Sequence, residues 1–182
     1  MDSELRPTLF KLLVPVLVIG IVLVASRRRG LSWSGDLGLT WPGVQPLLLW
    51  LAIWALWVAV GEWAIATFGL EQATPWKHHS ALVLVLRILA IGCVGPISEE
   101  LVMRGIVFAQ LRRTALRTVG AIVVCAAGWA VMHVQYGWST WVLIFLDGLI
   151  LGAARAHSRS LVPPILMHMA GNLFSIYQSL HR

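Results

Sequence analysis

Six long apolar stretches divide the chain, and the short segments between them hold most of its charged residues. The stretches cover residues 8–25, 44–68, 81–110, 119–133, 138–154 and 161–177. A helix needs about 20 mainly apolar residues to cross the hydrocarbon layer of a membrane, and most of these stretches approach or exceed that length. The pattern therefore predicts six membrane-spanning helices.

Composition supports the same class of protein. The chain has 182 residues, of which 58% are hydrophobic and 12% are charged. A soluble domain averages about 45–50% apolar residues, and a fold of this length has too little interior to bury the excess. We see no internal repeat and no linker between domains. We therefore expect an all-α, polytopic transmembrane bundle, with residues 1–182 forming one membrane domain in contact with the lipid bilayer.

The 14 Lys and Arg residues outnumber the 8 Asp and Glu residues, but they cluster between apolar stretches, so we do not expect nucleic acid as a partner. The clusters at residues 27–29, 112–117 and 155–159 fall in alternate loops. The intervening loops hold only Glu71 with Lys77, or no basic residue at all. Because cytoplasmic loops are enriched in Lys and Arg, we expect these three loops in the cytoplasm and both termini outside, in the cell membrane.

The third stretch is too long for one straight span. Residues 81–113 would form roughly 50 Å of helix at 1.5 Å per residue, against about 30 Å of hydrocarbon. Gly95 and Pro96 lie in its middle, and proline disrupts a helix interior. We therefore predict a break there, with a second helical limb that begins near Ser98, whose hydroxyl would cap it.

That second limb carries Glu99, Glu100 and Arg104 in otherwise apolar surroundings. Each charged residue at the centre of a spanning helix raises the free energy of membrane insertion by about 2.5–3.5 kcal/mol. The three residues therefore need compensating partners or a functional role. Glu100 and Arg104 are four residues apart, on one helix face, and should pair. Glu99 points about 100° away and should stay unpaired. A purely structural ion cluster at a helix start remains an alternative at this point.

Further polar residues occur in the later stretches. His133 lies near the far end of the fourth, and His168 and Asn172 share one face of the sixth. Measured along the helices at 1.5 Å per residue, Glu99 and His133 each lie roughly 21 Å from the cytoplasmic end. His168 and Asn172 lie at roughly 10 and 17 Å, a difference that helix tilt absorbs. The four groups can therefore share one pocket.

Asp147 lies midway along the fifth stretch. A carboxylate there could orient a histidine or pair with Arg155 or Arg87. We assign it no catalytic role.

Three motifs in this order resemble those of the CPBP family, which comprises CAAX prenyl endopeptidases of the Ras-converting type, bacterial relatives, and proteins linked to bacteriocin processing and self-immunity. The resemblance covers residues 88–177, and Leu37-Gly38-Leu39 is a weaker similarity. The matching residues are Glu99, Glu100 and Arg104, then Trp129 and His133, then His168 and Asn172. The second motif usually begins with Phe, and we expect Trp129 in its place to alter the shape of the pocket more than its chemistry.

The resemblance implies an intramembrane endopeptidase, with residues 88–177 as its catalytic core. Glu99 with His133 would activate a water molecule that attacks a peptide carbonyl, and His168 with Asn172 would donate hydrogen bonds to the developing oxyanion. Glu100 and Arg104 would have structural or positioning roles. No cofactor is implied. The expected partner is a membrane-associated protein or peptide substrate, which need not be prenylated.

Three alternatives stay open on the sequence alone. Glu99, His133 and His168 are ligand types that zinc accepts, so a zinc-dependent version of the same protease is one. A non-catalytic relative that binds a partner, such as a self-immunity protein, is the second, although it has no need of this set of residues. A small transporter is the third, but no inverted repeat supports it.

Overall fold

The computed structural model describes residues 4–69, 76, 79–134 and 136–181, and in these residues it is helical with no strand. The helices are α1 (Leu5–Arg28), α2 (Val44–Phe68), α3 (Ala81–Arg87), η1 (Ile88–Val94), α4 (Gly95–Glu100), η2 (Leu101–Val107), α5 (Phe108–Leu111), α6 (Arg117–Val131), α7 (Trp138–Ser158) and α8 (Val162–His181). The segments from α3 to α5 follow one another without a gap and form one rod. The predicted all-α fold is confirmed.

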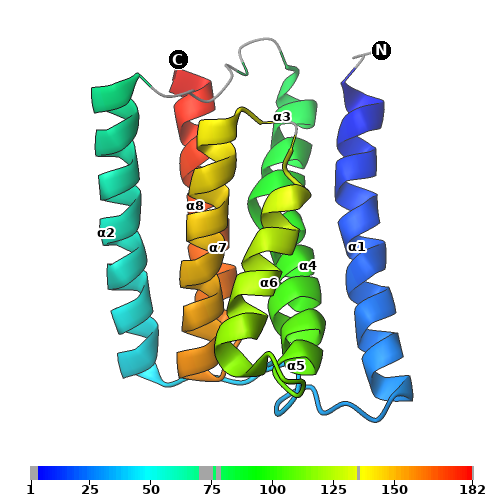
Figure 1. Cartoon of the computed structure of the whole chain (residues 1–182). Helices are drawn as coiled ribbons and strands as arrows, with labels where there is room; N and C mark the ends of the chain where they lie inside the picture. The colour runs from blue at the N-terminus through cyan, green and yellow to red at the C-terminus, as the bar shows by residue number, and fades with distance from the viewer. Residues whose placement is uncertain (1–3, 70–75, 77–78, 135, 182) are drawn as a thin grey trace.

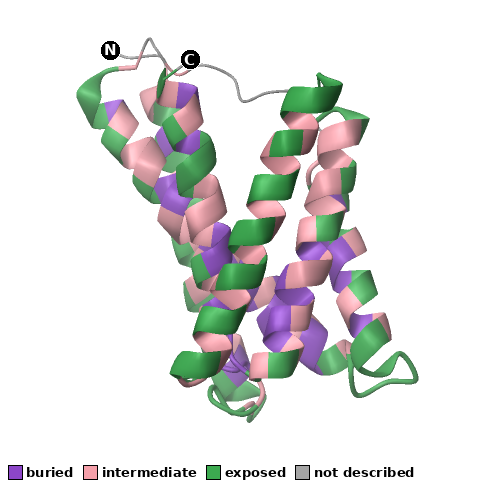
Figure 2. Ribbon diagram, turned by 90° about the vertical axis from the view of Figure 1, so that its left-hand side faces the viewer, coloured by how far each residue is buried: buried purple, intermediate pink, exposed green. Residues whose placement is uncertain are grey.

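The rods run side by side, with both chain ends at one end of the bundle and the α1–α2, α5–α6 and α7–α8 connections at the other (Figure 1). The antiparallel helices α6 and α7 pack together, α1 packs against the α3–α5 rod, and α2 packs against α7 and α8. Buried residues concentrate in the half of the bundle nearest these three connections (Figure 2). The protein therefore has its packed core off-centre, toward one end.

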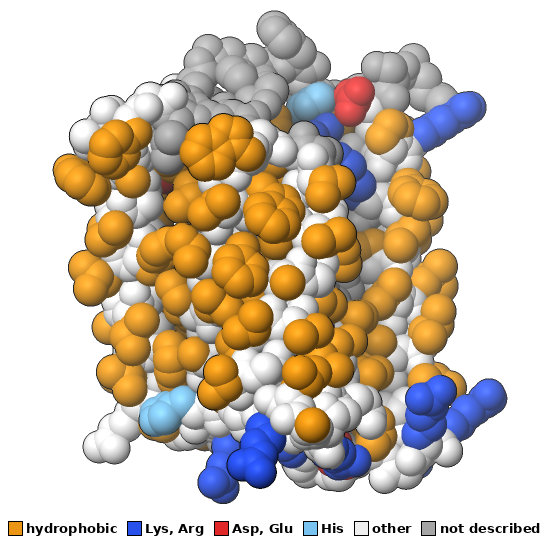
Figure 3. Space-filling view, in the orientation of Figure 1, with side chains coloured by type: hydrophobic (Ala, Val, Ile, Leu, Met, Phe, Trp, Pro, Cys, Tyr) orange, Lys and Arg blue, Asp and Glu red, His pale blue; other side chains and the backbone are white. Residues whose placement is uncertain are grey.

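Among the described residues, four helical stretches are long and apolar enough to cross a membrane: Leu5–Arg28, Val44–Phe68, Ala81–Leu111 and Trp138–Ser158. Arg117–Val131 is a shorter apolar helix. No residue of α2 is fully buried: Trp50, Leu51 and Trp54 pack against the core, and other apolar side chains, such as Leu48, Leu56 and Trp63, are exposed. On the face shown in Figure 3, hydrophobic side chains also cover most of the surface between the two ends. This is the surface of a multi-pass membrane protein.

The predicted break at Gly95 and Pro96 is wrong, because the rod stays helical through both residues. A wide π-helical segment, η1, precedes them, and the Gly95 N–H bonds to the Ala90 carbonyl five residues back. This wider turn accommodates the proline ring, which an ordinary α-helical turn would not. Ser98 does not cap a second limb either: its Oγ donates 2.8 Å to the Gly95 carbonyl.

Basic side chains gather at the end where the three connections lie (Figure 3). The loops predicted to share one side of the membrane are therefore on one side of the bundle. Glu71 and Lys77, on which part of that prediction rests, lie outside the described residues.

Arg155 departs from this pattern of exposed basic residues. It is part of α7 and only 2% exposed. Its Nε donates 3.1 Å to the Arg104 carbonyl, and its Nη2 donates 3.1 Å to the Asp36 carbonyl. Gly38 has φ +75°, and a Cβ there would lie 2.6 Å from the Arg155 guanidinium carbon. Arg155 therefore ties the α1–α2 loop to the rod, and only glycine fits beside it.

Candidate active site

A buried ion pair lies at the centre of the site. Arg104 Nη1 donates to Glu100 Oε1 at 2.7 Å, and both side chains are fully buried. Arg104 Nη2 also donates 3.1 Å to the Gly148 carbonyl on α7. The pairing predicted from the four-residue spacing is confirmed, although Arg104 lies in the π-helical segment η2. These contacts hold the rod against α7.

His168 on α8 joins this pair to the second glutamate. Its Nδ1 lies 3.0 Å from Glu100 Oε1, and its Nε2 lies 3.9 Å from Glu99 Oε2. The Glu99 side chain is 28% exposed, whereas that of Glu100 is fully buried. The two adjacent glutamates therefore differ in environment. One is neutralised by arginine, and the other faces a histidine in a partly open position.

Trp129 on α6 contacts Glu99, the partly exposed glutamate. Its indole Nε1 donates 2.7 Å to Glu99 Oε2. The Trp129 ring meets the rings of His133 and His168 edge to face, with centroids 5.3 and 5.0 Å apart. This donor was not predicted from the sequence, because the expectation for Trp129 concerned the size of its ring and not its N–H.

His133 lies in the turn that follows α6, since the helix ends at Val131 and not at residue 133. Its Nδ1 lies 2.9 Å from the Trp129 carbonyl oxygen. A carbonyl oxygen only accepts hydrogen bonds, so Nδ1 carries the proton. In the neutral ring Nε2 then has a free lone pair, which is the state required of a base.

Asn172 lies one turn from His168 on α8. Its Nδ2 donates 2.8 Å to the Ile91 carbonyl, in the π-helical segment η1. An amide nitrogen carries two hydrogens, so this bond leaves one for another acceptor. It also fixes which end of the amide faces the rod.

Asp147 lies midway along α7. Its Oδ1 is a buried oxygen without a hydrogen-bond partner. The two arginines considered as its partners bind elsewhere: Arg155 binds backbone carbonyls, and Arg87 binds the Glu4 carboxylate at 3.1 Å.

Three of the four residues predicted to share a pocket surround Trp129: Glu99 and His168 face each other, and Trp129 contacts Glu99 and the rings of His133 and His168. Asn172 instead bonds to the Ile91 carbonyl in η1. Within the part of the chain that the structure describes, no three His, Cys, Asp or Glu side chains are grouped as metal ligands. The arrangement presents one partly exposed carboxylate, two imidazoles and an indole N–H donor in largely apolar surroundings.

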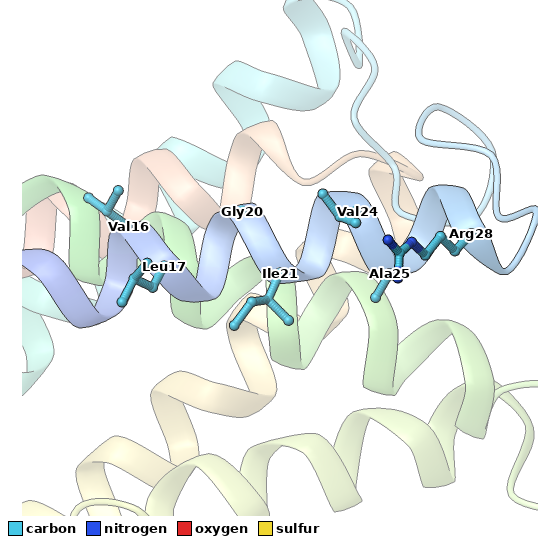
Figure 4. A pocket seen from close by; sticks show the side chains of 7 residues that line it. All are labelled: Val16, Leu17, Gly20, Ile21, Val24, Ala25 and Arg28. Carbon is cyan, nitrogen blue, oxygen red and sulfur yellow. The ribbon is translucent and has the colours of Figure 1, made fainter.

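A hollow on the surface lies elsewhere. It has a volume of about 460 Å³ and runs along α1 (Figure 4). It is lined by Val16, Leu17, Gly20, Ile21, Val24, Ala25 and Arg28. No residue of the glutamate–histidine cluster borders it, and its lining is apolar apart from Arg28. We therefore place no chemistry there.

Residues 80–174 match the model of one protein family, described as type II CAAX prenyl endopeptidase Rce1-like. The matched region includes the α3–α5 rod, α6, α7 and most of α8, and so contains every residue of the cluster. No curated protein and no solved structure gave a match.

Proposed function

Because the chain belongs to the Rce1-like family of type II CAAX prenyl endopeptidases, we propose that it is an intramembrane endopeptidase. Its substrate is a membrane-associated protein or peptide. The observation that carries the proposal is the unequal environment of the two glutamates. Glu100 is fully buried and paired with Arg104, whereas Glu99 is partly exposed and faces His168.

In the proposed reaction, Glu99 and His133 bind and activate one water molecule. Glu99 accepts a proton from the water while the His133 Nε2 lone pair orients it, and the water oxygen forms a bond to the peptide carbonyl carbon. Glu99 then returns the proton to the amide nitrogen as the carbon–nitrogen bond breaks. One carboxylate thus serves as base and then as acid, and no other reactant is needed.

His168 and Asn172 stabilise the negative oxygen that develops on the attacked carbonyl. Asn172 has one amide hydrogen left for this purpose. With Nδ1 of His168 donating to Glu100, Nε2 donates only when the ring carries both protons. Each such donor in a water-poor site contributes about 3 kcal/mol to transition-state stabilisation.

Glu100 and Arg104 position these groups rather than react. The Glu100 carboxylate fixes the orientation of the His168 ring, and Arg104 fixes Glu100 and also bonds α7 through the Gly148 carbonyl. Both partners bind Glu100 Oε1, and Oε2 is a buried oxygen without a hydrogen-bond partner. Because the side chain is fully buried beside Arg104, we assign it a positioning role rather than a role in proton transfer.

We place the basic connections in the cytoplasm and both termini outside, in a prokaryotic cell membrane, because positively charged loops stay on the cytoplasmic side. Single cysteines at Arg112 and Ser34 should therefore be protected from a membrane-impermeant thiol reagent in intact cells and labelled after permeabilisation. Cysteines in the α6–α7 connection, at Tyr136, should show the opposite behaviour. Labelling of position 112 in intact cells would reverse the orientation.

We expect the reaction to need no metal ion. A zinc-bound water loses its activation when the ion is removed, whereas a water activated by glutamate and histidine does not depend on an ion. Purified protein treated with a strong chelator should keep its rate of cleavage. Loss of cleavage on chelation, with recovery on addition of one equivalent of zinc, would instead make Glu99, His133 and His168 metal ligands.

A substrate trap tests the proposed function. The Glu99→Gln variant keeps the shape of the site and should hold its substrate uncleaved, so a photo-crosslinker placed at Met132 should capture a membrane protein that the wild type releases as fragments. If the captured partner is as intact in cells that produce the wild-type protein as in cells that produce Glu99→Gln, the result would favour the binding or self-immunity alternative.

A further inference from the structure

Trp129 is joined to both members of the water-activating pair. Its indole N–H donates 2.7 Å to Glu99 Oε2, and its backbone carbonyl accepts from His133 Nδ1 at 2.9 Å. The side chain is only 4% exposed. The Arg104 guanidinium lies over its ring, 4.8 Å from the centroid. One residue of α6 thus fixes a carboxylate on the α3–α5 rod and an imidazole in the following turn.

The indole N–H is the part of this side chain that phenylalanine cannot replace. A phenyl ring at this position could still meet the two histidines with its edge, but it has no hydrogen to donate. The expectation that tryptophan changes the shape of the pocket more than its chemistry is therefore incomplete. A charge-assisted hydrogen bond to a carboxylate is among the stronger and more directional contacts in proteins.

The bond leaves the two oxygens of Glu99 in unequal positions. Oε2 is engaged by Trp129 and faces His168 Nε2 at 3.9 Å. The other oxygen, Oε1, is then the one that can accept a proton from water. Because one oxygen of the carboxylate is held, the orientation of the other oxygen is fixed as well. A general base needs such a fixed orientation in order to take a proton from a bound water molecule efficiently.

We propose that Trp129 is a positioning residue of the reaction, whose indole N–H orients the Glu99 carboxylate so that Oε1 faces the attacking water. This inference rests on the proposed function. Trp129 touches neither the water nor the peptide; it acts through Glu99, and its carbonyl sets the tautomer of His133.

The hydrogen bond itself can be tested without a substrate. In protein with ¹⁵N-labelled tryptophan, the resonance that disappears in Trp129→Phe identifies the Trp129 indole N–H. Glu99→Gln should move that resonance, because the acceptor loses its charge. The indole of Trp50, which donates to His157 Nδ1 at 3.0 Å, serves as the control and should not move. If the chemical shift of the Trp129 indole N–H is the same in Glu99→Gln as in the wild type, the inference is overturned.

The role in catalysis is tested by kinetics on the captured substrate. Replacing Trp129 with the isosteric 3-benzothienylalanine removes only the N–H, and Trp129→Phe removes the N–H with part of the ring. Both should lower kcat by about tenfold or more and leave KM nearly unchanged, because the lost contact acts in the chemical step. Trp50→Phe should leave both constants at their wild-type values.

The outcomes separate this inference from the proposed function. If the wild type cleaves its substrate and the isosteric replacement cleaves it equally fast, Trp129 has no positioning role, although the protein is still a protease. If kcat falls only in Trp129→Phe and not with the isostere, the ring volume matters and the N–H does not. If the wild type cleaves nothing, the proposed function fails, and with it the role of Trp129.

Discussion

Replacing Glu100 with Ala is expected to remove most of the folded protein. The change leaves Arg104 fully buried with no carboxylate partner, and it also removes the acceptor for His168 Nδ1. Breaking one side of a buried ion pair costs about 3–5 kcal/mol of the free energy of unfolding, a large part of the total for a domain of this length. The amount of monodisperse protein after detergent extraction, and its thermal unfolding midpoint, measure the loss.

A double replacement distinguishes loss of the pair from loss of volume. Glu100→Met with Arg104→Met removes both charges and keeps apolar bulk at both positions. Exchanging a whole buried pair for apolar side chains is often neutral for stability, so the double variant should be more stable than Glu100→Ala alone. Glu100→Ala protein that accumulates and melts like the wild type would contradict the structural role of the pair.

Replacing Glu99 with Gln is expected to have the opposite profile. Its side chain is 28% exposed and has no arginine partner, so the variant should fold in wild-type amounts. Gln still offers an oxygen to the Trp129 N–H, but it cannot accept a proton from water. Loss of a general base lowers the rate by about 10²–10⁴-fold. Initial rates of cleavage by purified protein in vesicles measure this effect.

Glu62 on α2 provides the matched control for Glu99. It accepts 2.7 Å from Gln178 Nε2 and lies outside the cluster. Glu62→Gln makes the same chemical change at a carboxylate that has no assigned role in the reaction, so it should leave the rate of cleavage unchanged. Equal losses in the two variants would mean that the Glu99 effect is not specific to the site.

The fold and the ion pair were predictable because they depend on periodic features of the sequence. Apolar stretches of spanning length predict helices in a membrane, since only internally hydrogen-bonded backbone is stable there. The pairing of Glu100 with Arg104 follows from their four-residue spacing, and it is present. Both are properties of a single helix, which sequence alone describes well.

Local distortions of a helix, and features that depend on how separate helices meet, were not predictable. The π-helical turn that carries the chain through Pro96 is a local rearrangement with no signal in the apolar pattern. The hydrogen bond from Trp129 to Glu99 depends on the relative rotation of α6 and the α3–α5 rod. The position of Arg155 in a basic cluster predicts a loop residue that marks topology, but its contacts with the Asp36 and Arg104 carbonyls join segments far apart in sequence.

The most direct test of the account is a comparison of protein termini in cells. Membranes from cells that produce the wild-type protein and from cells that produce Glu99→Gln in equal amount are analysed for new amino termini by mass spectrometry. We expect one or a few termini, within or beside apolar segments of membrane-associated proteins, that appear with the wild type and are missing with Glu99→Gln. Identical sets of termini in the two membranes, at equal amounts of folded protein, would contradict the claim that Glu99 activates water for peptide hydrolysis.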